Sequence, residues 1–178
     1  MGVPYVPIIG LVGTDLLARR DDMVIAPDPF DGTTKTVVAK ALRPDFAVFH
    51  VPKADRAGNV SFGYAVEAMI LAEGARHVIV TAEEIVDRLT ERDAEGTFVP
   101  AIHVDTVVHA PRGAHPGGCP GRYEPDDAHM REYVAASADD AAFAAYLEKY
   151  VFGVAGHADY LARYIGGERR EPAQAIAT

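Results

Sequence analysis

Polar residues that could do chemistry gather just after the clearest apolar stretch of the sequence. That stretch, DFAVFHV at 45–51, is short and rich in aromatic and β-branched residues, which is typical of a strand, and KADRAGN follows at 53–59. In open α/β sheets, ligands bind outside the carboxyl ends of the strands, so residues 53–59 have the position of a binding site. The alternative is a simple turn, in which Asp, Gly and Asn serve the backbone geometry and the charges are solvated.

A serine between small residues comes next, in NVSFG at 59–63. This segment nearly matches the nucleophile elbow G-x-S-x-G, with Asn59 in place of the first glycine. A serine hydrolase would also need an acid and a base, and Asp105 and His115 could be named for these roles. Any sequence of this size offers such pairs, so we favour the interpretation that the serine is not a nucleophile.

Several histidines raise the question of a metal site. His103, Asp105 and His109 alternate along a segment expected to be extended, which would place them on one face. Zinc usually takes three or four ligands at characteristic spacings, and His115 with Cys119 adds too few. We therefore expect surface or structural histidines and no metal site. The sequence also has neither a Walker loop nor a G-x-G-x-x-G motif for nucleotide phosphates.

A second loop, GAHPGGC at 113–119, follows the strand-like stretch VDTVVHAP. Its glycines would let backbone amides approach a ligand closely, and His115 could donate a hydrogen bond or move a proton near neutral pH. The alternative is a flexible Gly/Pro loop that covers an interface. This loop belongs to a longer Gly- and Pro-rich region at 111–125, and loops of that length are usually functional or mobile.

The order of apolar stretches indicates which fold positions these segments. Strand-like stretches at 45–51 and 76–82 alternate with helix-like stretches at 64–73 and 83–92, and one or two strands are expected within 98–110. This alternation predicts an α/β fold with an open, largely parallel sheet flanked by helices, followed by a C-terminal helical segment.

The first part of the chain is harder to place in this pattern. Residues 2–11 have the composition of a buried strand, although no earlier element is available to pair with it, and residues 36–42 are expected to form a helical turn or two before Pro44. We expect a single α/β domain over 1–168 and a flexible tail over 169–178.

Composition excludes several classes of protein. The 178 residues are 49% hydrophobic and 24% charged, close to the averages for folded domains. Lys and Arg number 17 against 26 Asp and Glu, a net charge of −9 without basic blocks, which argues against a nucleic-acid partner. No apolar run approaches the roughly 18 residues of a membrane span, and the single cysteine excludes an internal disulfide. We expect a cytoplasmic protein with no membrane partner.

Four segments, taken together, resemble one known family. They are GVPYVPIIGLVGTD at 2–15, ALRPDFAVFHVPKADRAGN at 41–59, VDTVVHAPRGAHPGGC at 104–119, and HMREYVAAS with YLEKYVFG within 129–153. The chain resembles the family I CoA-transferases, specifically the A (alpha) subunit of the glutaconate CoA-transferase type. The resemblance covers nearly the whole chain, and the order and spacing of the segments make it fairly specific.

The resemblance implies an α/β protein that pairs with a B (beta) subunit to move CoA between carboxylic acids. In that chemistry a glutamate attacks the acyl-CoA thioester and carries CoA as an enzyme-bound thioester. The nucleophilic glutamate of the two-chain enzymes belongs to the B subunit, so no catalytic residue is assigned in this chain. No permanently bound cofactor is implied beyond the coenzyme A thioester, which is a substrate.

Four glutamates of this chain are not expected to take that role. They lie in stretches with helix-like composition, where surface roles are expected: Glu67, Glu73, Glu83 and Glu84.

Five residues are expected to line the face that binds substrate and CoA: His50, Arg56, Asn59, Ser61 and His115. Arg56 could pair with an acyl carboxylate or a CoA phosphate through its planar guanidinium. Asn59 could hydrogen-bond the thioester oxygen as charge develops on it. These roles rest on the positions of the residues at strand ends.

Two other functions stay open within the resemblance. One is a subunit of a related hydrolase that opens rings of CoA thioesters, in which water replaces the acceptor. The other is a non-catalytic, truncated subunit that only binds its partner. Compared with the usual alpha chain of the family, this one is expected to lack the N-terminal part with its glycine-rich early strand and turn.

Overall fold

The computed structural model describes residues 3–63, 67–166 and 175–177. The chain divides into two compact units, Met1–Pro44 and Asp45–Thr178, which are called here the N-terminal and C-terminal units. Within the described residues, no helix is long and apolar enough to cross a membrane.

The N-terminal unit is a small antiparallel sheet with one short helix. Its strands β1 (Tyr5–Ile8), β2 (Met23–Pro27) and β3 (Lys35–Lys40) are arranged in the order β1-β3-β2, and α1 (Asp15–Ala18) connects β1 to β2. The helical turn expected at 36–42 is therefore wrong. The run TVVAK is rich in β-branched residues, which pack well on a pleated surface, and it pairs on both sides as the central strand.

The strand expected at 2–11 is present, but the expectation that it is buried is wrong. Strand β1 pairs antiparallel with β3, and the side chains of Tyr5 and Val6 are more than half exposed. The apolar side chains of Tyr5 and Val6 therefore lie on the surface of the N-terminal unit and not in its core.

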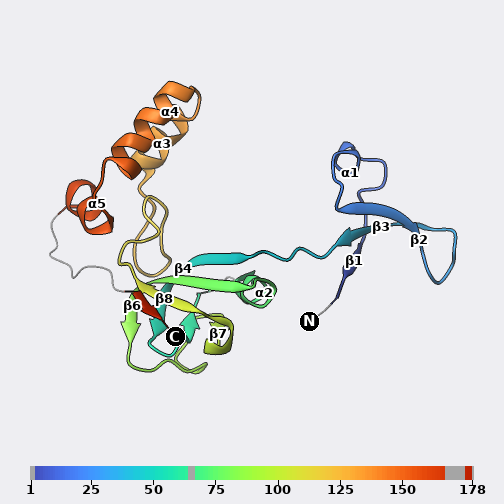
Figure 1. Cartoon of the computed structure of the whole chain (residues 1–178), viewed down its shortest axis with the longest axis horizontal. Coiled ribbons are helices and arrows are strands. Elements are labelled where there is room, and N and C mark those ends of the chain that lie inside the picture. The colour runs from blue at the N-terminus through green and yellow to red at the C-terminus, as the bar shows by residue number, and fades with distance from the viewer. Residues whose placement is uncertain (1–2, 64–66, 167–174, 178) are drawn as a thin grey trace. The chain divides into compact units, whose positions relative to one another are not determined.

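The C-terminal unit contains a six-stranded sheet in the order β7-β5-β4-β6-β8-β9. Figure 1 labels β4, β6, β7 and β8 of this sheet. Its strands are β4 (Phe46–Asp55), β5 (Val60–Ser61), β6 (His77–Val86), β7 (Phe98–Val99), β8 (Thr106–His109) and β9 (Ala175–Ala177). The central strands β4, β6 and β8 are parallel, and the outer pairs are antiparallel. The predicted α/β class is confirmed, and the sheet is mixed.

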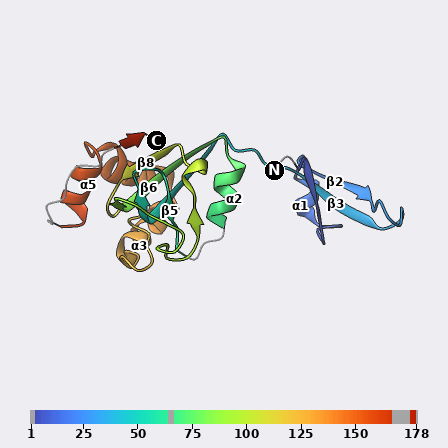
Figure 2. The ribbon, with the colours of Figure 1, turned by 90° about the horizontal axis from the view of Figure 1, so that it is seen from below.

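Helices lie on both sides of this sheet. Figure 2 shows the sheet between α2 (Glu67–Gly74) on one side and α5 (His157–Tyr164) on the other. The core packs against α2 through Ala68 and Ala72, and its strand residues include Val51 and Val80, which are fully buried. The remaining helical elements are η1 (Ala101–His103), α3 (Asp127–Ala136), α4 (Asp140–Leu147) and the π-helical turn η2 (Glu148–Phe152).

The opposite face and the outer edge of β4 are less covered. Phe46 and Val48 point away from the α2 face and are 60% and 65% exposed. On the edge away from β6, strand β5 pairs only with Lys53 and Ala54. Within the described residues, the first half of β4 therefore has a strand neighbour on one side alone.

The helix expected at 83–92 is wrong. Strand β6 continues through Glu83 to Val86, and its parallel pairing with β4 extends as far as the pair Asp55 and Val86. Helix formation there is overridden by this long-range pairing. His103 also departs from expectation, because it lies in η1 and not in an extended segment with Asp105 and His109.

The expected single domain over 1–168 stays a prediction beside the two units. The expected tail at 169–178 falls mostly outside the described residues, although 175–177 form β9.

Candidate functional site

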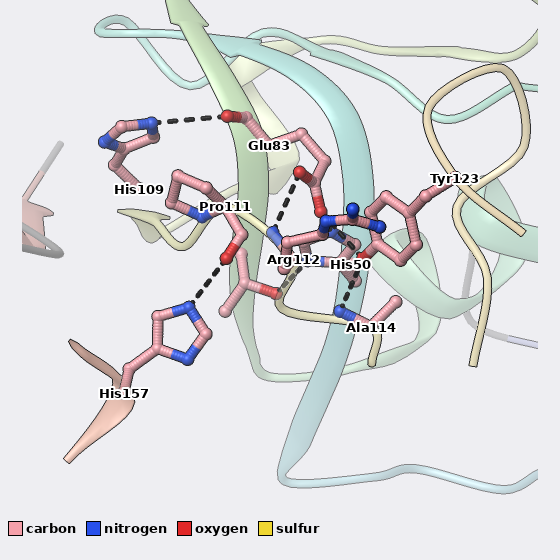
Figure 3. A network of polar contacts seen from close by, with 9 residues as sticks. His50, Glu83, His109, Pro111, Arg112, Ala114, Tyr123 and His157 are labelled. Atoms are coloured by element: carbon pink, nitrogen blue, oxygen red, sulfur yellow. Dashed lines mark hydrogen bonds and ion pairs between the residues drawn. The ribbon is translucent and has the colours of Figure 1, made fainter. Parts of the chain in front are cut away.

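The side chain of Glu83 is the centre of a polar network at the C-terminal half of β6 (Figure 3). It is only 9% exposed. Its Oε1 lies 2.7 Å from Nε2 of His50 and accepts from the Tyr123 hydroxyl at 2.8 Å, while its Oε2 accepts from the backbone N–H of Arg112 at 2.9 Å. One carboxylate thus joins β4, β6 and the loop that follows β8.

The register of the sheet explains how these residues meet. His50 on β4 is paired with Thr81 on β6, and side chains alternate along a strand, so Thr81 and Glu83 share one face. Thr81 Oγ1 lies 2.9 Å from His50 Nδ1. Since an ionised carboxylate only accepts, Nε2 of His50 carries a proton and donates it to Glu83.

The network keeps Glu83 ionised. Burial opposes ionisation, but the hydrogen bonds from His50, Arg112 and Tyr123 outweigh it and hold the pKa of the Glu83 carboxyl below its usual value. Burial, together with the hydrogen bond to Glu83, raises the pKa of Tyr123 far above the ordinary value for a phenol. The site therefore contains a fixed anion held by three hydrogen-bond donors.

The loop at 111–125 is fastened over this network. Arg112 has a positive φ of 60°, a conformation that non-glycine residues adopt at an energetic cost, and its guanidinium lies 4.4 Å from the ring centre of Tyr123. The Tyr123 hydroxyl also accepts from the N–H of Ala114 at 3.1 Å. A Cβ on Gly113 would lie 2.9 Å from the His50 ring, so glycine is required for this close approach.

Two histidines hold the base of the loop. His157 of α5 has Nε2 2.7 Å from the carbonyl oxygen of Pro111, and His109 has Nε2 3.2 Å from the carbonyl oxygen of Glu83 (Figure 3). Because a carbonyl oxygen only accepts, each of these ring nitrogens is the donor. Both histidines therefore help to hold the loop in place.

Of the five residues predicted to line the site, His50 lies in the network, and the turn after β4 holds Arg56 and Asn59. Arg56 is exposed in this turn. The Asn59 amide donates to Asp55 at 2.9 Å, and its Oδ1 accepts from the N–H of Ala101 at 3.0 Å. Both ends of the Asn59 side chain are thus engaged in holding the turn, and its substrate role stays a prediction.

Asp55 organises that turn from a buried position. Its carboxylate accepts from the backbone N–H groups of Ala57, Asn59 and Leu89. Burial opposes its ionisation, but these hydrogen bonds and that of the Asn59 side chain keep the pKa of Asp55 below its usual value. For much of residues 53–59, the alternative interpretation therefore applies: Asp55 and Asn59 hold the backbone of a turn.

Ser61 is fully buried in β5. Its hydroxyl accepts from the N–H of Glu95 at 2.8 Å and lies 3.3 Å from the Glu95 carbonyl oxygen. His115 is engaged elsewhere, with Nδ1 2.7 Å from the Tyr160 hydroxyl and Nε2 3.3 Å from Asp126. His115 is therefore not the base for Ser61, in agreement with the interpretation that this serine is not a nucleophile.

Sequence reasoning missed four members of the network: Thr81, Glu83, Arg112 and Tyr123. The expectation that Glu83 lies in a helix with a surface role is wrong. The signal that could have found it is HVIVTAE itself, because the alternation of a more exposed and a buried face continues from His77 through Glu83.

Comparison with known proteins agrees with this architecture. The family model "Coenzyme A transferase" matches residues 1–110. The chain is 31% identical to the A subunit of glutaconate CoA-transferase from Acidaminococcus fermentans, over 90% of this chain and 56% of that protein. It is 30% identical to the A subunit of 3-oxoadipate CoA-transferase from Pseudomonas knackmussii, over 94% of this chain and 59% of that protein.

A solved structure has the same fold. The crystal structure of glutaconate coenzyme A-transferase from A. fermentans matches with a TM-score of 0.81 at 27% identity, covering 91% of this chain and 56% of that one. The chain thus spans a little over half the length of these relatives. The match of the family model to more than half of the chain, together with the shared fold, places this protein in the coenzyme A transferase family.

Proposed function

We propose that this chain acts as the A (alpha) subunit of a heteromeric enzyme that moves CoA between carboxylic acids in the cytoplasm. The observation that carries the proposal is the similarity to the A subunit of glutaconate CoA-transferase over 90% of this chain, supported by the matching fold. The partner would be a B subunit, and the substrates would be an acyl-CoA and a free carboxylate.

The geometry of Glu83 supports a nucleophile on the partner. Both oxygens of this carboxylate are occupied by three hydrogen bonds, and the side chain is nearly buried. A glutamate that attacks a thioester needs a free, accessible oxygen. In the proposed mechanism, Glu83 positions His50 and the loop, and a glutamate of the B subunit forms the thioester with CoA.

Arg112 is the group we propose for the substrate anion. Its backbone is fixed by Glu83 and its guanidinium lies over Tyr123, and no carboxylate of the described residues forms an ion pair with it. A guanidinium held in this way presents its planar set of donors to a carboxylate or a phosphate. Arg56, exposed after β4, is the second candidate, and His50, Asn59, Ser61 and His115 remain proposed lining residues.

The proposal is tested with the chain co-purified with its B subunit. The complex is incubated with an acyl-CoA, and the peptides of both chains are searched by mass spectrometry for a CoA adduct on a glutamate. We expect the adduct on the B subunit and CoA transfer that depends on an acceptor carboxylate.

Other results would lead to different conclusions. An adduct on Glu83 would contradict the assignment of the nucleophile. Release of free acid and CoA without an acceptor would instead indicate the hydrolase, and binding without turnover would indicate a non-catalytic subunit. Arg56→Ala with unchanged transfer kinetics would remove Arg56 from the binding residues.

A further inference from the structure

Three side chains with metal-ligating atoms converge at the start of α3, away from the Glu83 network. His115 comes from the loop, Asp126 is the N-cap residue of α3, and His129 lies in its first turn. One ligand atom of each lies within 4.8 Å of the other two. The two histidines are nearly buried, whereas the Asp126 side chain is 40% exposed and leaves the group one side open to solvent.

Each of the three side chains is held by a hydrogen bond through a second atom. Nδ1 of His115 is 2.7 Å from the Tyr160 hydroxyl, and Nε2 of His129 is 2.8 Å from the Tyr146 hydroxyl. Oδ1 of Asp126 accepts from the backbone N–H of His129 at 3.0 Å. Partners of this kind orient metal ligands in proteins, because they fix the ring and its tautomer.

One pair of the atoms that remain has a spacing suited to zinc. Zinc bonds to nitrogen and oxygen of about 2.0–2.2 Å in a tetrahedron require neighbouring ligand atoms about 3.3–3.6 Å apart. Nε2 of His115 and Oδ2 of Asp126 are 3.3 Å apart, which is long for a hydrogen bond but matches this edge of the tetrahedron. His129 would close in on the other two atoms as the ion binds.

The charges of the group also suit a cation. Burial, and then the nearby His115, lowers the pKa of His129, so its imidazole is neutral near pH 7. The backbone N–H of His129 lowers the pKa of Asp126, so its carboxylate is ionised. Glu132 and Lys149 are the other charged groups that act on His129, and they pair with each other at 2.8 Å.

We propose that His115, Asp126 and His129 bind a divalent transition metal of the zinc type, with a fourth position left to solvent. Two imidazoles and one carboxylate form a ligand set that zinc uses in sites with an open position. Nε2 of His115 must be free of a proton to bind the ion, so in the occupied site the neutral ring carries its one proton on Nδ1 and donates it to the Tyr160 hydroxyl. The bound ion then joins the loop directly to α3.

The test uses the full chain after removal of metals with a chelator, titrated with Co²⁺ as a spectroscopic probe. We expect one equivalent of Co²⁺ to give the ligand-field absorption of a four- or five-coordinate ion and Zn²⁺ to displace it. Asp126→Asn should weaken Co²⁺ binding at least about 100-fold, because even partners outside the ligand set change affinity 10- to 100-fold. Asparagine is also a good N-cap, so α3 should keep its start.

The neighbour Asp127 provides a matched control. It lies in the same first turn, and Asp127→Asn removes the same charge without removing a ligand, so it should leave the affinity within a few-fold of the wild type. Equal losses in both variants, or only the spectrum of hexa-aqua Co²⁺ with the wild-type chain, would overturn the proposal.

A second group of possible ligands, His50, Glu83 and Cys119, gives a distinct signal. Its carboxylate is already occupied, and burial raises the pKa of the Cys119 thiol, which disfavours the thiolate. An intense sulfur-to-cobalt charge-transfer band that disappears in Cys119→Ser would place the metal there and overturn the assignment. Binding here is measured without turnover, so its failure would leave the proposed function standing.

Discussion

At the scale of single residues, the carboxylate of Glu83 connects two strands and a loop that are distant in the sequence. Replacing it by Glu83→Gln keeps an acceptor oxygen but puts an NH₂ group where donors already point. We expect a loss of about 1.5–3 kcal/mol in the free energy of unfolding, since hydrogen bonds to charged groups contribute that much. Urea denaturation of both proteins measures the difference.

Glu84→Gln is the control for this change. The next residue of the strand pairs with Arg122 at 3.1 Å on the surface, where such pairs contribute about 0–1 kcal/mol. If both variants lose the same stability, the network around Glu83 has no special role.

The depressed pKa of Glu83 also predicts a pH dependence. The pKa of the Glu83 carboxyl is about 4.5 in the unfolded state and lower in the folded state. Such a group contributes its full stabilisation at pH values above the unfolded pKa. That contribution is lost as the pH falls through the folded pKa. We expect the stability difference between wild type and Glu83→Gln to be constant above about pH 5 and to shrink below it. A difference that grew on acidification would contradict the sign of the shift.

Arg112 has a testable role in substrate binding. In the complex with the B subunit, Arg112→Met should raise the KM for the substrate that carries the recognised anion by roughly 10- to 100-fold, as expected for loss of a charge-assisted hydrogen bond. Arg122→Met, which removes a surface cation from the same loop, should leave KM unchanged. Equal kinetics of wild type and Arg112→Met would move the anion site elsewhere, with Arg56 as the next candidate.

At the scale of elements, local patterns predict what local forces decide. The strand at 45–51 is predictable because its apolar run is compact, and the C-terminal helices are predictable because their aromatic residues recur at helical spacing. The prediction for 83–92 fails because its Glu, Leu and Arg residues favour a helix locally, whereas parallel pairing of β6 with β4 extends the strand.

The candidate site shows the same division. His50 can be selected from its position near the end of the predicted strand and His115 from the loop that follows another, and both are held in polar clusters. Their partners could not be predicted, since Glu83 is 33 residues from His50 and Tyr160 is 45 from His115. Such contacts depend on the register of strands and the path of the loop, which a single sequence does not contain in local form.

The loop gives a prediction at this scale. In Gly113→Ala, the new methyl group would meet the His50 ring at 2.9 Å and the Ala110 carbonyl oxygen at 2.7 Å. We expect a loss of about 1–3 kcal/mol from overpacking, together with reduced transfer activity. Gly74→Ala, at the end of α2 with no atom near the added methyl, should cost little or nothing. Denaturation curves of the two variants measure the difference. Equal free energies of unfolding would show that the loop rearranges at Gly113 to accommodate the methyl group.

At the scale of the whole molecule, the division after Pro44 predicts how the chain unfolds. Two compact units with separate sheets should give two transitions in calorimetry, and a chain starting at residue 45 should keep the second of them. A single cooperative transition for the full chain would instead support the single domain expected over 1–168 from the sequence.

The exposed first half of β4 has a consequence for how the protein must be made. Among the described residues, the first half of β4 has no strand partner on one edge, and Phe46 and Val48 are exposed, so it can pair with the same strand of another copy. We expect chains synthesised alone at high concentration to accumulate as insoluble aggregates, and simultaneous synthesis of the B subunit to increase the yield if that subunit covers this strand. The ratio and timing with which a cell translates the two mRNAs would then determine how much of this chain stays out of aggregates.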